Sequence, residues 1–206
     1  AKLNAVTSKH KIATLSLRLS SQWSDALMGG DDYMTMLIQY ARAHALCIIA
    51  LQEHKFAFAD GGLKYITRDG WLLVCGSATA TGQGGVGFLI APTLVSACVA
   101  TLVNERTLQL RFTKVGSTPI DYFCYYAPTA LDPRAQQTSL DALGIAISTT
   151  SHPVILGDFN AILMAGDLGA HGTKMDRCSE IRLAARIALL QFLNVHALVS
   201  TGTLFG

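Results

Sequence analysis

The sequence predicts one α/β domain of the α+β type, spanning residues 1–206, and three observations support it. Half of its 206 residues are hydrophobic, which is enough to bury a substantial core. Apolar runs of strand length alternate with stretches of helical periodicity, and no repeat or linker interrupts them. In the middle of the chain the strand-like runs follow one another closely, which is typical of an antiparallel meander.

The first third of the chain contains two expected strands and one expected helix. The strands are residues 12–17 and 47–51, and the second is wholly apolar, like a central strand covered on both faces. The helix is expected over residues 31–45, with Asp31 or Asp32 as its cap. Its apolar residues recur on one face. They are Met34, Leu37, Ile38 and Ala41.

The rest of the chain continues with a meander and two helices. Five strands are expected at residues 71–75, 86–90, 95–102, 108–112 and 121–126. Asp132 and Pro133 begin a helix that turns Leu140, Leu143 and Ile147 inward. A buried strand at 154–156, a helix at 180–193 and the beginning of a strand at 196–199 follow. The packed side of the second helix holds Ile181, Ala185, Ala188, Leu189 and Phe192.

Composition excludes some classes of protein and leaves others open. Charged residues are only 15% of the chain and the net charge is +2, so much of the surface must be neutral or apolar, and charge alone indicates no nucleic-acid partner. No apolar run reaches the roughly 18 residues of a membrane span. The five cysteines form no C-x-x-C pair, which predicts buried, reduced thiols and an intracellular protein. The basic, acid-free first 24 residues leave an organelle transit sequence as an alternative.

Acidic and amide side chains stand where two apolar strands end. Glu53 follows the strand at 47–51, and Asp158 and Asn160 follow the strand at 154–156. Side chains at strand ends can project from the rim of a sheet into a shared cleft. Carboxylate and amide oxygens suit a hard ion such as Mg²⁺, so these residues are candidates for a magnesium site, and charges on solvated loops are the alternative interpretation.

Four short words of the sequence resemble those of the exonuclease–endonuclease–phosphatase superfamily, in the same order and at similar separations. They are Leu51-Gln52-Glu53, Gly84-Gly85-Val86-Gly87-Phe88, Tyr126-Ala127-Pro128-Thr129 and Leu156-Gly157-Asp158-Phe159-Asn160-Ala161. The resemblance extends from Ile12 to Phe205. The Tyr-Ala-Pro-Thr form and the long helix before Leu198 are most similar to the abasic-type endonuclease domains of non-LTR retroelements.

The resemblance implies a two-sheet, four-layer α/β/β/α sandwich and a metal-assisted hydrolysis of phosphodiesters. Glu53 would bind Mg²⁺, and Tyr126 would donate a hydrogen bond to the scissile phosphate. Asp158 would position or deprotonate the attacking water, and Asn160 would orient phosphate or water. The substrate would be DNA.

Two departures from the family pattern stand out. Ser16 replaces the asparagine with which the family's first strand usually ends. The family's last strands, with an aspartate and a Ser-Asp-His-type word, would lie beyond Gly206, so we expect the C-terminal strands to be missing and a protein partner to cover the exposed edge. Among the histidines, only His171, in a glycine-rich loop near the expected cleft, is a candidate replacement.

Two functions therefore remain open at this point. One is a Mg²⁺-dependent endonuclease that nicks DNA in the nucleus, inactive or weak as this chain alone. The other is a retroelement-derived domain that has lost catalysis and serves as a structural or RNA-binding subunit of a larger ribonucleoprotein or organellar assembly, for example in mitochondria. The low charge and Ser16 favour the second.

Overall fold

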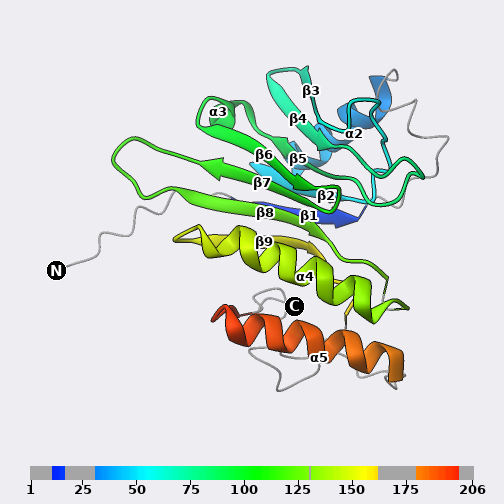
Figure 1. Cartoon of the computed structure of the whole chain (residues 1–206). Helices are drawn as coiled ribbons and strands as arrows, with labels where there is room; N and C mark the ends of the chain where they lie inside the picture. Colours follow the sequence, from blue (N-terminus) through cyan, green and yellow to red (C-terminus); the bar gives the residue numbers. More distant parts are fainter. Residues whose placement is uncertain (1–10, 17–30, 130, 162–179, 200–206) are drawn as a thin grey trace.

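Two β-sheets stacked face to face form the centre of the molecule, with helices on both outer sides (Figure 1). The computed structural model describes residues 11–16, 31–129, 131–161 and 180–199. Within these residues the layers run α2, first sheet, second sheet, then α4 and α5. The predicted α/β/β/α sandwich is confirmed.

The first sheet has five strands in the order β1-β2-β5-β4-β3. Its β1 and β2 are parallel, and all other pairs are antiparallel. The strands are β1 (Ile12–Ser16), β2 (Ile48–Gln52), β3 (Leu63–Arg68), β4 (Trp71–Gly76) and β5 (Val86–Ile90). Helix α2 (Asp31–Ala43) packs Met34, Leu37 and Ile38 onto the outer face of this sheet, as its periodicity predicts.

The second sheet has four strands in the order β6-β7-β8-β9, and β8 and β9 are parallel. The strands are β6 (Cys98–Asn104), β7 (Thr107–Phe112), β8 (Ile120–Tyr126) and β9 (Pro153–Asp158). Helices α4 (Pro133–Ser148) and α5 (Glu180–Val195) cover its outer face. The Asp132 carboxylate accepts a hydrogen bond from the Ala135 N–H at 2.9 Å, which confirms the predicted cap of α4.

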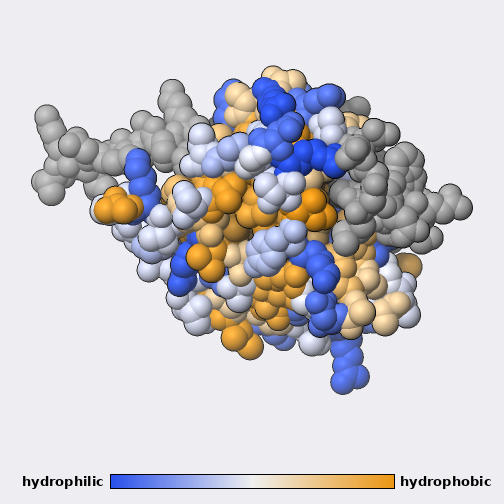
Figure 2. All heavy atoms as spheres, turned by 90° about the horizontal axis from the view of Figure 1, so that it is seen from above, coloured by the Kyte–Doolittle hydropathy of each residue, from blue (hydrophilic) through white to orange (hydrophobic). Residues whose placement is uncertain are grey.

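Three apolar layers hold these elements together. The central layer, between the sheets, includes Phe88 and Leu110, and the outer layers lie under α2 and under α4 and α5. Apolar side chains also reach the surface between polar ones (Figure 2), as the low charge predicts. The exposed apolar residues include Val99, Val115, Leu131, Ile145 and Val195.

The structure corrects the predicted elements in three places. Strand β3 was not among the expected strands. The run at 95–102 begins as the single-turn helix α3 (Pro92–Val95), and β6 starts only at Cys98. Residues 196–199 are not the start of a strand, because α5 continues to Val195 and these residues form its C-terminal cap.

That cap is a Schellman motif with an alanine where glycine is usual. The Leu198 N–H donates to the Leu193 carbonyl at 2.8 Å, the Ala197 N–H donates to Asn194 at 3.2 Å, and Ala197 has a φ of 50°. Helix α2 ends in the same way at Ala45, which has a φ of 52°. In both helices the apolar residue after the cap, Leu46 or Leu198, packs against the core cluster to which the helix belongs. Because Leu198 is apolar for this reason, residues 196–199 resemble the start of a strand in sequence.

Two further predictions concern the cysteines and membranes. The four cysteines of the described residues are free; Cys75 and Cys124 are buried as predicted, whereas Cys47 and Cys98 are only partly buried. Burial raises the pKa of the Cys75 and Cys124 thiols to about 12, so these two thiols stay protonated. None of the described helices is long and apolar enough to span a bilayer.

Candidate functional site

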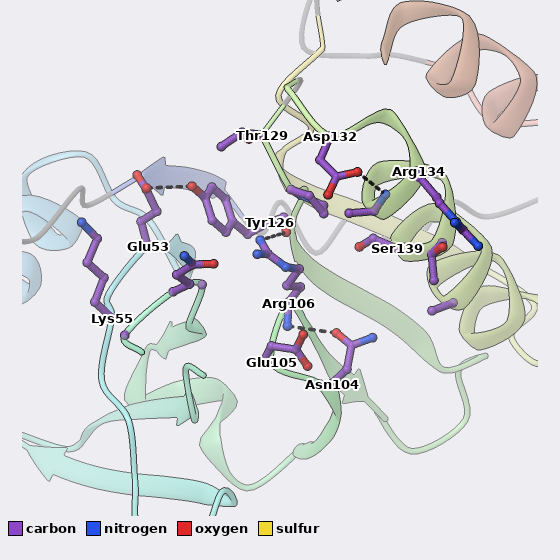
Figure 3. Close-up of a pocket in the computed structure, with 17 residues that line it drawn as sticks. Glu53, Lys55, Asn104, Glu105, Arg106, Tyr126, Thr129, Asp132, Arg134 and Ser139 are labelled. Carbon is purple, nitrogen blue, oxygen red and sulfur yellow. Dashed lines mark hydrogen bonds between the residues drawn. The ribbon is translucent and has the colours of Figure 1, made fainter. Parts of the chain in front are cut away.

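The site forms where β2 of one sheet and β8 and β9 of the other end at the same rim. Tyr126 closes β8 and is paired in register with Asp158, the last residue of β9. Glu53 follows β2 directly. The Tyr126 hydroxyl donates a hydrogen bond to Glu53 Oε1 at 2.7 Å, which joins the two sheets at this point (Figure 3).

The segment that follows β9 is attached to the segment that follows β8. The Ala127 N–H donates to the Asp158 carbonyl at 2.8 Å, and the Asn160 amide donates to the Ala127 carbonyl at 2.8 Å. The Asn160 N–H in turn donates to the Asp158 carboxylate at 2.9 Å. Gly157 has no space for a Cβ atom, because one would overlap the Tyr125 backbone. The Gly-Asp-Phe-Asn and Tyr-Ala-Pro segments are therefore held together by hydrogen bonds and close backbone packing at the ends of β8 and β9.

Tyr126 is a neutral hydrogen-bond donor in this setting. The residue is 8% exposed, and burial raises the pKa of its phenol to about 12, with the hydrogen bond to Glu53 and the Glu53 charge acting in the same direction. The Asn160 side chain lowers this pKa and the Asp158 charge raises it. The phenol therefore keeps its proton at neutral pH and acts as a hydrogen-bond donor.

Glu53 lies in a strained turn. Glu53 and Lys55 have φ angles of 57° and 60°, in the left-handed region that costs about 1–2 kcal/mol per residue for side chains with a Cβ. His54, between them, is 1% exposed. Glu53 and Lys55 both line an open groove, and His54 does not. Burial lowers the pKa of His54 to about 4, so the ring is neutral at neutral pH.

An open groove of about 840 Å³ extends from Glu53 and Tyr126 along the start of α4 (Figure 3). Its walls are the turn after β2, the glycine loop before β5, the β6–β7 hairpin and the first turns of α4. Six charged residues, three acidic and three basic, line it. They are Glu53, Lys55, Glu105, Arg106, Asp132 and Arg134.

Arg106 is a functional candidate that the sequence analysis missed. Its guanidinium carbon lies 5.5 Å from the centre of the Tyr126 ring, and its Nη1 donates to the Tyr126 carbonyl at 3.4 Å. Its own carbonyl accepts from the Tyr126 N–H at 2.9 Å. Only the β6–β7 hairpin brings Arg106 next to Tyr126, so no local sequence signal identifies it.

A smaller hollow of about 340 Å³ lies on the other side of Asp158, between β1 and β9. Thr14 and Gln52 line it. The Thr14 hydroxyl donates to Gln52 Oε1 at 3.0 Å, and Gln52 Nε2 donates to Cys124 Sγ at 3.1 Å. Gln52 of the Leu-Gln-Glu word is thus a buried link between the sheets, and Asp158 is reached from this hollow whereas Glu53 is reached from the groove.

Four of the six predicted site residues lie together at the rim: Glu53, Tyr126, Asp158 and Asn160. Ser16 ends β1 and is paired with Gln52, but its side chain lies outside the described residues, and so does His171. The described residues contain no cluster of three histidine, cysteine or acidic side chains. The donors that are present fit Mg²⁺, because this ion keeps several waters and needs only one or two carboxylates from a protein.

The two-sheet sandwich, the residues at its rim and the four sequence words are shared with a known family of proteins. The family model described as "Endonuclease/Exonuclease/phosphatase family" matches residues 19–200, and the chain belongs to this family. No curated protein matches the sequence.

Solved structures of the same fold include abasic-site and retroelement endonucleases. An AP endonuclease from Leishmania major has a TM-score of 0.61 at 15% identity, with 89% of this chain and 65% of that chain covered. The endonuclease domain of TRAS1, a telomere-specific non-LTR retrotransposon, has a TM-score of 0.56 at 11% identity, with 90% and 70% covered. An AP endonuclease from Archaeoglobus fulgidus has a TM-score of 0.54 at 18% identity, with 90% and 70% covered. At these identities the likeness shows the fold, and the chain spans just under two thirds of the Leishmania protein.

Proposed function

We propose that this chain forms the core of a Mg²⁺-dependent endonuclease that cleaves phosphodiester bonds in DNA. The observation that carries the proposal is the meeting of Glu53, Tyr126, Asp158 and Asn160 at one rim, with the Tyr126 hydroxyl 2.7 Å from Glu53. The similar folds of two AP endonucleases and a retrotransposon endonuclease domain support DNA as the substrate.

Each residue has a role that its environment permits. Glu53 would hold Mg²⁺, which when bound neutralises charge on the phosphoryl oxygens. Tyr126, kept protonated by burial and by Glu53, would transfer its hydrogen bond from Glu53 to a phosphate oxygen. Asp158 would orient or deprotonate the attacking water. Asn160, whose amide is anchored on the Ala127 carbonyl, would orient phosphate or water.

The groove provides a path for the substrate strand beside this rim. Lys55, Arg106 and Arg134 can contact phosphates, which carry most of the affinity in protein–DNA complexes. The same groove has three carboxylates, so we expect moderate affinity that falls steeply with salt and rises when a divalent ion is present.

The second candidate function is nucleic-acid binding without catalysis, as a subunit of a larger assembly. One observation favours it: Tyr126 and Glu53 satisfy each other in the structure, so the rim is stable without substrate. The two candidates differ in what Mg²⁺ does. An endonuclease requires it for strand cleavage, whereas a binding subunit holds nucleic acid in the presence of EDTA and cleaves nothing.

A plasmid-nicking assay tests the proposal. The protein that contains this chain is incubated with supercoiled DNA in Mg²⁺ or in EDTA, alongside Asp158→Ala and a matched control, Asp141→Ala. Asp141 lies on the exposed side of α4, where it is bonded to Gln137. We expect nicking only with Mg²⁺, a loss of roughly 10²-fold or more in Asp158→Ala, and full activity in Asp141→Ala. Binding without nicking in the wild type favours the second candidate and refutes the first.

A further inference from the structure

The turn that carries Glu53 is built around one buried side chain. Glu53 and Lys55 are both in the left-handed region, with φ angles of 57° and 60°, and they flank His54. Two such residues in one three-residue turn persist only when the surroundings fix the backbone. His54 is 1% exposed and stacks on Phe56, with the ring centres 4.8 Å apart. The buried side chain in the middle of this strained turn is therefore His54.

Both ring nitrogens of His54 are used. The Phe56 N–H donates to Nδ1 at 3.1 Å, and Nε2 lies 3.2 Å from the Val86 carbonyl. Because Nδ1 accepts, the proton is on Nε2, which donates to Val86. The ring thus ties the turn after β2 to the first residue of β5, the strand that pairs with β2.

The glycine loop before β5 closes directly over the ring. A Cβ on Gly85 would lie 2.6 Å from Nδ1 and Cε1 of His54, so no larger residue fits. The Lys55 N–H donates to the Gly84 carbonyl at 3.3 Å, and the Gly85 N–H donates to the Glu105 carbonyl at 3.1 Å. Three walls of the groove, the turn, the glycine loop and the β6–β7 hairpin, are therefore linked around His54.

We propose that His54 is a positioning residue: its two hydrogen bonds hold the strained turn so that the Glu53 carboxylate faces Tyr126 and the groove keeps its shape. His54 does not line the groove, so it acts through Glu53 and the glycine loop and not by contact with substrate. The effect on metal binding rests on the proposed function, whereas the linkage of the three walls does not.

Three variants separate the two hydrogen bonds. His54→Asn places an acceptor near the position of Nδ1 and loses the bond to Val86, and His54→Gln keeps a donor near the position of Nε2 and loses the bond from Phe56. His54→Ala loses both. His152→Ala is the matched control, since His152 is exposed in the loop before β9. Asparagine and glutamine each retain one bond, so the comparison holds even where the alanine variant does not fold.

Two readouts are measured on each folded variant: amide hydrogen exchange at Lys55 and Gly85, and the affinity for Mn²⁺ used as a probe of the Glu53 site. We expect exchange at both amides to rise at least tenfold in His54→Ala and less in the other two, with strand amides unchanged. We expect Mn²⁺ affinity to fall about tenfold in His54→Ala and not at all in His152→Ala.

The outcomes distinguish the two claims. Unchanged exchange at Gly85 in every His54 variant overturns the inference, and so does wild-type Mn²⁺ affinity in a folded variant whose turn exchanges faster. If the wild-type protein binds no Mn²⁺, the proposed metal-dependent function fails. Exchange at Lys55 and Gly85 then decides alone whether His54 links the three walls.

Discussion

Replacing Gly85 by alanine tests how closely the glycine loop packs on His54. Gly85 has a φ of 85°, and an added Cβ would lie 2.6 Å from the His54 ring and 3.0 Å from the Lys55 nitrogen. The left-handed backbone costs alanine about 1–2 kcal/mol. Forcing a methyl group into a packed site costs typically 1–3 kcal/mol more. Alanine also restricts the unfolded chain, which offsets about 0.4–1 kcal/mol of these costs. We therefore expect the free energy of unfolding to fall by about 2–4 kcal/mol.

Urea unfolding measures this loss, and Gly116→Ala is the control. Gly116 has a similar φ of 75° with nothing within 4 Å of an added Cβ, so it bears only the backbone cost of about 1 kcal/mol. With an m value of about 2 kcal/mol/M, the midpoint falls by ~1–2 M for Gly85→Ala and by ~0.5 M for Gly116→Ala.

A double-mutant cycle isolates the contact with the ring. In a His54→Ala background the ring is absent, and Gly85→Ala then meets only the Lys55 nitrogen and the backbone cost. Its effect should shrink by about 1 kcal/mol or more. Equal costs for Gly85→Ala and Gly116→Ala, or no coupling between positions 54 and 85, would refute the packing described for this loop.

Three other substitutions test the Tyr126 hydrogen bond, the ionisation of His54 and the left-handed residue at the end of α2. Tyr126→Phe removes the donor to Glu53, so the free energy of unfolding should fall by about 1 kcal/mol and the nicking rate by about 10²–10³-fold, with exposed Tyr40→Phe unchanged in both assays. Because His54 is buried neutral with a pKa of about 4 against its ordinary 6.5, the unfolded chain binds more protons between these values. Stability should therefore fall by about 3 kcal/mol as pH drops from 6.5 to 4, and urea midpoints in EDTA should show a smaller fall in His54→Gln. Ala45→Gly relieves a left-handed alanine and should raise the free energy of unfolding by about 0.5–1 kcal/mol, whereas Ala142→Gly, inside α4, should lower it by about 1 kcal/mol; thermal melts distinguish the two signs.

The sequence predicts the parts of the site that lie on strand ends. Glu53, Asp158 and Asn160 each follow a short apolar run, and such a run is a strong local signal for a buried strand. Tyr126 ends the strand that pairs with β9, so its place beside Asp158 follows from the order of the strands. The four-layer arrangement came from the resemblance of whole words, because apolar runs alone do not say how two sheets stack.

The sequence does not predict the parts that depend on how loops meet. Arg106 sits in a hairpin with no motif, and only the pairing of β6, β7 and β8 places its guanidinium over Tyr126. Strand β3 at the edge of the first sheet is only partly buried and carries Lys64 and Arg68, so it lacks the apolar run that identifies the other strands. For residues 196–199 the error has the opposite sign, because a strand was predicted where there is none. Leu198 is apolar because it packs against the core under α5.

A Mn²⁺ titration of the ¹⁵N-labelled protein, followed by NMR, tests most directly the claim that three strand ends form one divalent-metal site. We expect the amide signals of Glu53, Tyr126, Asp158 and Asn160 to broaden first, EDTA to restore them, and Glu53→Gln to abolish the effect. Broadening centred elsewhere, or none at these four residues, would contradict it.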